Sequence, residues 1–511
     1  MTDTAPLTFP ESTIDAQSSE TAPSVATGQI ERAESAPETL SPRNRLVIAV
    51  LLVSTFVVIL NETIMGVAIP HLMSSLDIPA SAAQWVTTAF MLTMAVVIPI
   101  TGFLLQRFNT RPVFIAAMTF FSAGTLIAAI APGFEVLLIG RVVQACGTAI
   151  VFPLLITTVM NLVPASRRGL MMGNISIVIS VAPAIGPTIS GAILSVLDWR
   201  WMFIIVLPIA LIALIVGARL IKNVTTPVKV PFDILSVILS AFGFGGLVFG
   251  LSNLGSGGGI TSISGWMPLA VGVIALALFV LRQLRLQRSD RALLDLRTFR
   301  SRTFSFSIVM FAISMAAFFG SIIILPIYMQ NVLGLTTLST GLLLLPGGLV
   351  MGLLAPFVGR IYDRFGPTVL LVTGAVIISA DFWCMTMLTD HTSFWWVLAA
   401  HVTLSLGLAL LFTPLFSASL GSLRSSLYSH GSAIVGTVQQ LAGAAGTALF
   451  VTVMSSQAAS LIAGGATDVS ATAAGIRSAF TCAAIISVFA IPVAFFIRKQ
   501  KNAPDNMPIG H

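Results

Sequence analysis

Three ionisable residues lie inside long apolar stretches of the chain, namely Glu62, Arg141 and Asp381. A charge in an apolar stretch is costly, so such residues usually mark ion or proton pathways or bind a charged ligand. A buried carboxyl can take up a proton in one environment and release it in another, and a nearby cation changes that balance. We therefore predict that these three residues carry out proton coupling or transport.

The individual roles differ. We hypothesise that Glu62 is a proton carrier or an anchor for a cationic substrate, with a carboxylate that only packs as the alternative. Arg141 keeps its charge at any relevant pH and therefore needs hydrogen-bond acceptors around it. Three roles stay open for Asp381: a second protonation site, a cap for a polar pocket near Trp383, and a neutral packed carboxyl. His401 is interpreted as a polar residue with satisfied hydrogen bonds.

The sequence lacks the motifs that would indicate catalysis, metal binding or nucleotide binding. The sequence contains no nucleophile elbow, zinc-protease motif or nucleotide-binding loop. Its three cysteines, Cys146, Cys384 and Cys482, have no metal-ligand or disulfide spacing. We therefore expect a protein that is not an enzyme, needs no metal or cofactor, and is not itself an ATP-driven pump.

The elements that position these charges are helices in a membrane. Hydrophobic residues make up 56% of the 511 residues and charged residues only 9%, against roughly 25% charged residues in a soluble domain. A membrane span needs about 20 mostly apolar residues. Fourteen such runs lie near 46–69, 83–105, 112–131, 136–160, 170–196, 201–221, 233–252, 266–284, 304–327, 338–359, 367–388, 394–420, 431–457 and 475–497. The predicted fold class is an all-α, multi-pass membrane protein.

Basic residues are concentrated in alternate loops, which sets the orientation. Lys and Arg mark the cytoplasmic side of a membrane protein. With both termini in the cytoplasm, the inner loops hold nearly all of them, including seven arginines between 282 and 302, and only Arg200 and Arg477 lie outside. This placement accounts for the net charge of +7 without a nucleic-acid partner. We expect a bacterial inner-membrane location.

A repeated loop divides the chain into halves. Both halves contain G-x-x-x-[QD]-R-F-[NG] between their second and third helices. The first copy has Gly102, Gln106 and Arg107, and the second has Gly359, Asp363 and Arg364. Repeated halves are typical of transporters that rock one bundle against the other around a central site.

The repeat predicts a division into five parts. These are a disordered cytoplasmic tail (1–44), an N-terminal six-helix bundle (45–222), a two-helix insert with a basic linker (223–303), a C-terminal six-helix bundle (304–498) and a second tail (499–511). The N-terminal tail is rich in Ser, Thr, Ala, Pro and Glu, a composition typical of disorder.

Further motifs resemble one transporter family. The first span contains Leu60-Asn61-Glu62-Thr63, the fourth contains Arg141-x-x-Gln144-Ala-x-Gly147, and the fifth contains Gly186, Pro187 and Gly191. Trp199-Arg200-Trp201 and His430-Gly431 follow in order. Over residues 46–498 the chain resembles the major facilitator superfamily, specifically the fourteen-helix drug:proton antiporters of the EmrB/QacA type and their lincomycin-efflux branch.

The resemblance implies a function and several roles. It implies a multidrug efflux antiporter, driven by the proton gradient, that exports hydrophobic or amphipathic compounds such as lincosamide-like antibiotics. Arg141 would tune the proton step, and the two loop motifs and the fifth-helix motif would govern conformational change. The family usually has Asp and Gly where this chain has Gln106 and Asn109, so a charged latch in the first half is in doubt.

Other functions remain as alternatives. Export of a metabolite such as an amino acid, peptide or siderophore is the second hypothesis. A channel or a membrane-embedded enzyme is the third, against which the duplicated halves and the missing motifs argue. The expected partners are protons, small hydrophobic substrates and the lipid bilayer. The oligomeric state stays open, with a monomer as the simplest arrangement.

Overall fold

A computed structural model describes residues 41–498, except for 79, 222, 224–226, 228–232 and 256–262. The described residues contain fourteen helices long and apolar enough to cross a membrane and no strand, which confirms the predicted fold class. In chain order the helices of the N-terminal half and the insert are α1 (Pro42–Leu76), α2 (Ala80–Arg107), α3 (Thr110–Ala129), α4 (Phe134–Leu162), α5 (Arg168–Leu194), α6 (Trp201–Leu220), α7 (Ile234–Gly255) and α8 (Ile263–Leu286). Those of the C-terminal half are α9 (Arg302–Ile327), α10 (Thr337–Phe365), α11 (Thr368–Met385), α12 (Phe394–Gly421), α13 (Tyr428–Ala463), α14 (Asp468–Val488) and the short α15 (Ala490–Phe495), which continues the last span.

Local sequence sets where several helices begin. Ser41 accepts a hydrogen bond from the Asn44 backbone N–H at 3.2 Å, and Pro42 occupies the first turn. A hydroxyl cap followed by proline is a preferred helix start. Helix α1 therefore begins at Pro42, within the last three residues of the predicted 1–44 tail. The rest of both predicted tails lies outside the described residues.

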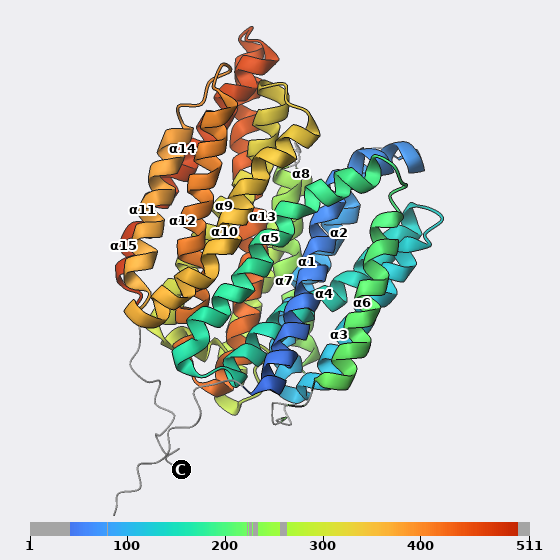
Figure 1. Ribbon diagram of the computed structural model, residues 1–511, viewed down its shortest axis with the longest axis vertical. Helices are drawn as coiled ribbons and strands as arrows, with labels where there is room; N and C mark the ends of the chain where they lie inside the picture. Colours follow the sequence, from blue (N-terminus) through green and yellow to red (C-terminus); the bar gives the residue numbers. More distant parts are fainter. Residues whose placement is uncertain are drawn as a thin grey trace, which may run out of the picture. The chain divides into compact units, whose positions relative to one another are not determined.

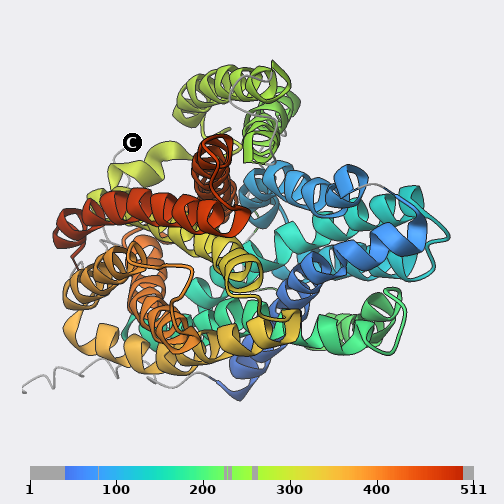
Figure 2. The same cartoon turned by 90° about the horizontal axis from the view of Figure 1, so that it is seen from above.

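The helices pack as two six-helix bundles with an inserted pair (Figures 1 and 2). Helices α1 to α6 pack among themselves, as do α9 to α14. The inserted helices α7 and α8 pack on each other, and α7 also lies against α2 and α13, so the pair adjoins both bundles (Figure 2). The described helices thus group by their contacts as six, two and six.

The two bundles meet mainly through four helices. Helix α5 packs along α10, and α2 packs along α13. We call the end that holds the α2–α3, α4–α5, α10–α11 and α12–α13 turns the basic end. Residues in these turns or in the helix ends beside them contact the opposite bundle there, as described below.

The α7–α8 pair is joined by an ion pair at its basic end. Asp233, just before α7, accepts hydrogen bonds from Arg282 Nε and Nη2, both at 2.8 Å, and a further one from the Ser236 hydroxyl. The hydrogen bond from Arg282 lowers the pKa of Asp233, and burial only partly opposes it. The pair therefore favours the folded state whenever Asp233 is ionised.

Replacing Asp233 with Asn is expected to destabilise this pair by about 1 kcal/mol at neutral pH, a value for a partly exposed pair with good geometry. Because the folded-state pKa lies below the ordinary value near 3.9, this stabilisation exists above that value and disappears as pH falls through the lowered pKa. Thermal unfolding of wild type and variant should therefore differ at pH 7 and converge at strongly acidic pH. Arg285→Gln, at an exposed position of α8, serves as the control and should unfold like wild type at both pH values.

Candidate functional site

Arg141 is the centre of a buried polar network. Its side chain lies on α4, and the residue is 1% exposed. Nη1 donates hydrogen bonds to Gln144 Oε1 at 2.5 Å and Asn61 Oδ1 at 3.2 Å, and Nε donates to the Val86 carbonyl at 3.5 Å. The guanidinium also lies 3.9 Å from the centre of the Phe90 ring, a cation–π arrangement that stabilises a desolvated cation. One arginine thus ties α4 to α1 and α2.

Close packing of α3 and α4 extends this network. Gln144 Nε2 donates to Thr125 Oγ1 of α3 at 2.7 Å. Small residues at the crossing make the short approach possible, since a Cβ on Gly147 would lie 2.3 Å from the Ala117 carbonyl oxygen. Because Arg141 and Gln144 are three residues apart on one helix, they share a face. The spacing of the fourth-helix motif therefore builds the network directly.

Glu62 lies next to this network and lines a cavity between the bundles. It follows Asn61 on α1, is half-buried, and interacts electrostatically with Arg141. No ion pair to Glu62 forms among the described residues. The structure therefore brings two of the three predicted charges together, with Glu62 left open to the cavity and Arg141 held by neutral acceptors.

The cavity is small and mostly apolar. Its volume is about 40 Å³, which admits a few waters, whereas drug-sized ligands occupy roughly 300–1,000 Å³. It must widen before it can hold such a ligand. The lining residues come from α1, α2, α4 and α13: Thr55, Val58, Ile59, Glu62, Met94, Ile98, Thr148, Ala149, Phe152, Pro153, Gly436, Gln439 and Gln440.

Two glutamines of α13, Gln439 and Gln440, line this cavity together with Glu62. Gln439 Oε1 is buried and has no hydrogen-bond partner within the described part of the chain. Gln440 Nε2 lies 4.0 Å from Met94 Sδ, a weak contact. A buried amide oxygen without a partner is costly. The cavity thus offers a carboxylate and a free amide oxygen, both acceptors, to a ligand that brings donors.

Asp381 lies elsewhere. It is buried on α11, which packs against α12, α14 and α15, whereas α1 and α4 pack in the other bundle. Its Oδ2 atom has no hydrogen-bond partner among the described residues. Trp383 is 48% exposed. The structure does not bring Asp381 into the Glu62–Arg141 site, and its role stays a prediction.

The loop motifs join the two bundles at the basic end. Asp363 of α10 accepts hydrogen bonds from the backbone N–H groups of Gly169 and Leu170, both at 2.9 Å. These groups belong to the first turn of α5, where the helix dipole favours an anion. In the first copy, Gln106 Nε2 donates to the Ser426 carbonyl at 3.2 Å. We call each of these contacts a latch: the latch of the C-terminal half is charged, and that of the N-terminal half is neutral.

The motif arginines and glycines lie around these latches. Arg107 and Arg364 are exposed, with their guanidinium groups 6.0 and 5.1 Å from the Phe103 and Phe365 rings. Added Cβ atoms would lie 3.1 Å from His430 Nδ1 at Gly102 and 2.2 Å from the Gly169 carbonyl oxygen at Gly359. Both glycines therefore allow a close contact between the bundles.

The two glycines of the fifth-helix motif differ in how closely they pack against other helices. A Cβ on Gly186 would lie 2.4 Å from Thr63 Oγ1, so α5 contacts α1 directly beside Glu62. A Cβ on Gly191 would have no atom within 4 Å apart from its chain neighbours and the nearby backbone of α5, so close packing does not explain that glycine. Pro187 lies in α5, but its side chain falls outside the described residues.

Several site residues have no assigned role in the sequence prediction. Asn61 adjoins Glu62, and Gln144 lies one turn from Arg141, so proximity to a buried charge is a signal that could have identified both. Gln439 is a polar residue within an apolar run, which is a weaker signal. Phe90 has no such signal, because its sequence context matches that of many lipid-facing or core phenylalanines.

Arg141→Lys is expected to reduce transport by about tenfold or more, since one ammonium cannot replace the planar fork that reaches Asn61, Gln144 and the Val86 carbonyl together. Uptake into inverted membrane vesicles measures this effect. Arg219→Lys, at an exposed position, is the control and should transport normally. Full activity of Arg141→Lys would show that only the positive charge matters.

Comparisons with known proteins agree with this architecture. A profile of the Major Facilitator Superfamily matches residues 51–447. The chain is 43% identical over 469 residues to the uncharacterised MFS-type transporter YcnB of Bacillus subtilis (strain 168), covering 91% of this chain and 98% of that protein. It is 40% identical over 461 residues to the lincomycin resistance protein LmrB of Listeria monocytogenes, covering 89% and 97%.

A solved structure shares the fold. The human organic anion transporter MFSD10 superimposes with a TM-score of 0.61 at 14% sequence identity, covering 89% of this chain and all of that one. With the family profile and the two bacterial relatives, the conclusion is direct: this chain belongs to the Major Facilitator Superfamily and is a multi-pass membrane transporter.

Proposed function

We propose that this transporter is a proton-coupled efflux antiporter for hydrophobic or amphipathic compounds. The observation that carries the proposal is the position of Glu62, which lines the cavity between the bundles and interacts electrostatically with the buried Arg141. A carboxyl at this place is reached both by protons and by a ligand in the cavity. The proton gradient is the energy source, and no cofactor is required.

The cycle follows from the two states of this carboxyl. Ionised Glu62 attracts Arg141 and any cationic group of a ligand in the cavity, and protonation removes both attractions. Protonation from one side of the membrane thus favours release of the ligand, and deprotonation toward the other side restores the binding state. The bundles rock around the cavity between these steps, with the contacts of Asp363 and Gln106 closing the basic end.

The substrate class follows from the cavity wall. Met94, Ile98 and Phe152 provide apolar surface, and methionine adapts to ligands of different shape. Glu62 and Gln439 provide acceptors. An amphipathic molecule with an amine or hydroxyl donor fits these features. The similarity to a lincomycin resistance protein supports including lincosamides among the substrates.

The orientation is part of the proposal. The basic end faces the cytoplasm, both termini lie inside, and the protein resides in the bacterial inner membrane, because arginines concentrate in the loops of that end. Substrates, protons and lipid are the partners, and a monomer contains the complete cavity.

Inverted membrane vesicles test the function. With an imposed pH gradient, acidic inside, vesicles containing the protein should accumulate a labelled lincosamide and release it when the gradient is collapsed. Vesicles without the protein are the control. Accumulation that is indifferent to the gradient would contradict proton coupling. Gradient-driven accumulation of amino acids or peptides, with none of lincosamides, would favour a metabolite exporter.

A further inference from the structure

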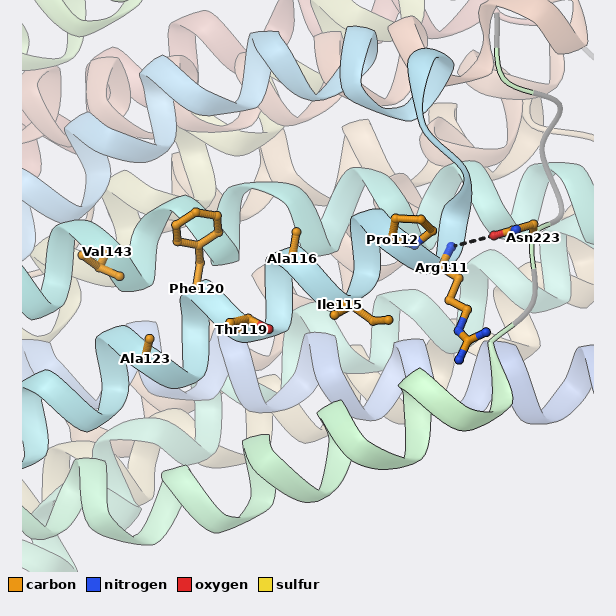
Figure 3. A pocket seen from close by; sticks show the side chains of 9 residues that line it. All are labelled: Arg111, Pro112, Ile115, Ala116, Thr119, Phe120, Ala123, Val143 and Asn223. Atoms are coloured by element: carbon orange, nitrogen blue, oxygen red, sulfur yellow. Dashed lines mark hydrogen bonds between the residues drawn. The ribbon is translucent and has the colours of Figure 1, made fainter.

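A second cavity lies far from Glu62, on the outer surface of α3. It is an open groove with a volume of about 740 Å³. Figure 3 shows its lining: apart from Val143 of α4 and Asn223, which follows α6, all labelled side chains come from α3. None of these residues is acidic. The groove shares no residue with the cavity at Glu62.

The α3 residues form a stripe along one helix face. They recur at three- and four-residue intervals, namely Arg111, Pro112, Ile115, Ala116, Thr119, Phe120 and Ala123. Small side chains at Ala116, Thr119 and Ala123 leave space, while Phe120 beside them is 48% exposed. Because this helix spans the membrane, the exposed apolar surface faces hydrocarbon. The stripe forms a shallow apolar groove in which a flexible apolar chain fits.

The groove is polar at one end only. Arg111, in the first turn of α3, is exposed, and its guanidinium has no hydrogen-bond partner within the described part of the chain. Its backbone N–H donates to Asn223 Oδ1 at 3.3 Å, so the Asn223 side chain lies beside the start of α3 (Figure 3). Gly217 of α6 packs on Phe114 of α3, so the exposed Arg219 lies at this same end. Among the described residues that line the groove at this end, none is acidic, so its charge is positive.

The dimensions match one leaflet of a bilayer. From Arg111 to Ala123 the helix rises about 18 Å at 1.5 Å per residue, and one leaflet of the hydrocarbon core is about 15 Å thick. Arg111 thus lies at the level of lipid phosphates while Ala123 lies near the midplane. A lipid standing in its own leaflet would place its head group against Arg111 and an acyl chain along the stripe.

We infer that this groove is a binding site for an anionic phospholipid. The phosphate and the negative head group contact Arg111 and the amide of Asn223, and one acyl chain occupies the groove from Ile115 to Ala123. The charge selects the head group, and the apolar stripe holds the chain. The inference is independent of the export mechanism, because the groove requires neither Glu62 nor a proton gradient.

Native mass spectrometry of the full-length protein in detergent tests this site. Phosphatidylglycerol and phosphatidylcholine with identical acyl chains are added in parallel. Wild type should bind phosphatidylglycerol more tightly, and Arg111→Gln should lower that affinity about fivefold, the effect of one basic residue at an anionic surface. Affinity for phosphatidylcholine should change little in this variant.

Three further variants separate the effects of charge, groove shape and the export site. Arg302→Gln removes an exposed arginine from the first turn of α9, also at the basic end, and should bind phosphatidylglycerol like wild type. Ala116→Phe fills the groove without changing charge and should weaken binding of both lipids. Glu62→Gln should leave lipid binding unchanged, so failure of the export proposal and failure of this one are distinguishable.

Several results would overturn the inference. Equal affinity of wild type for the two lipids would remove the charge selection. Equal loss of phosphatidylglycerol binding in Arg111→Gln and Arg302→Gln would indicate a general attraction to the basic end. Photolabelling of the groove by an amphipathic drug analogue that phosphatidylglycerol does not displace would assign the groove to a substrate instead.

Discussion

Glu62→Gln is expected to lower proton-driven export by about 100-fold, the scale on which removing a positioned proton-transfer group acts. Glutamine keeps the shape and hydrogen-bonding capacity of the side chain but cannot bind and release a proton. It also removes the attraction between Glu62 and Arg141. The neutral acceptors around Arg141 remain, so the buried network should persist and the variant should fold.

The measurement compares gradient-driven uptake with substrate binding. Uptake of a cationic and of a neutral amphipathic substrate is followed in inverted vesicles, and binding is measured on purified protein. A proton carrier predicts loss of driven uptake for both substrates, with binding of the neutral one retained. Loss restricted to the cationic substrate would assign Glu62 the role of an anchor instead.

Matched variants locate the effect. Glu135→Gln makes the same chemical change at an exposed position in the first turn of α4 and should transport normally. Asp381→Asn should have a smaller effect than Glu62→Gln, because Asp381 lies on α11, away from the Glu62–Arg141 site. An equal effect at Asp381 would show that a second carboxyl takes part in coupling, as one of its three predicted roles requires.

Gly359→Ala is expected to hinder closing of the basic end and to reduce transport strongly. An added Cβ would lie 2.2 Å from the Gly169 carbonyl oxygen and 2.9 Å from Leu170 Cα, both backbone atoms that cannot rotate away. Helices α5 and α10 must therefore separate. A penalty of at least about 2 kcal/mol, typical of overpacking, falls on the closed state and shifts its equilibrium roughly 30-fold.

Gly341→Ala is the matched control on the same helix. Its added Cβ would meet only Thr188 Oγ1 at 3.8 Å, an ordinary contact. Both changes raise the helix propensity of α10 equally, so a difference between them reports the interhelical contact alone. The control should transport like wild type.

Spin labels at the basic end report the conformation. Cysteines introduced at Ser166 and Ser425, both exposed and in turns of opposite bundles, are labelled after replacement of the three native cysteines. Gly359→Ala should shift the distance distribution toward longer values, and Gly341→Ala should not. Normal transport with an unchanged distribution in Gly359→Ala would mean that this contact does not limit closure.

Much of the architecture could be predicted because bilayer insertion depends on local properties. The hydrophobic runs gave fourteen spans, and the structure contains the same number among its described residues. The repeated motif around Gly102 and Gly359 predicted two related loops, and both motifs contain residues that contact the opposite bundle. Length, hydropathy and spacing within one segment suffice for such predictions.

Contacts between helices could not be predicted in the same way, because they depend on how each helix is rotated relative to its neighbours. A soluble helix has an apolar stripe that indicates which face is buried, but a membrane helix is apolar all round, so its rotation is not encoded in hydropathy. Hydropathy therefore did not indicate which of the three buried charges lie together. Packing placed Glu62 and Arg141 at one site and Asp381 in the other bundle.

The unknown rotation of each helix also explains why the other contacts at the site were not predicted. The repeat predicted two related loops, but only the structure showed that Asp363 caps the first turn of α5 while Gln106 reaches a single carbonyl. Gln439 has only a weak sequence signal and the groove on α3 has none, because the free amide oxygen and the groove both depend on how neighbouring helices are rotated. The sequence by itself determined the spans, their repeated halves and the charges inside them. The tertiary structure decided which charges meet, since that depends on helix rotation and close packing.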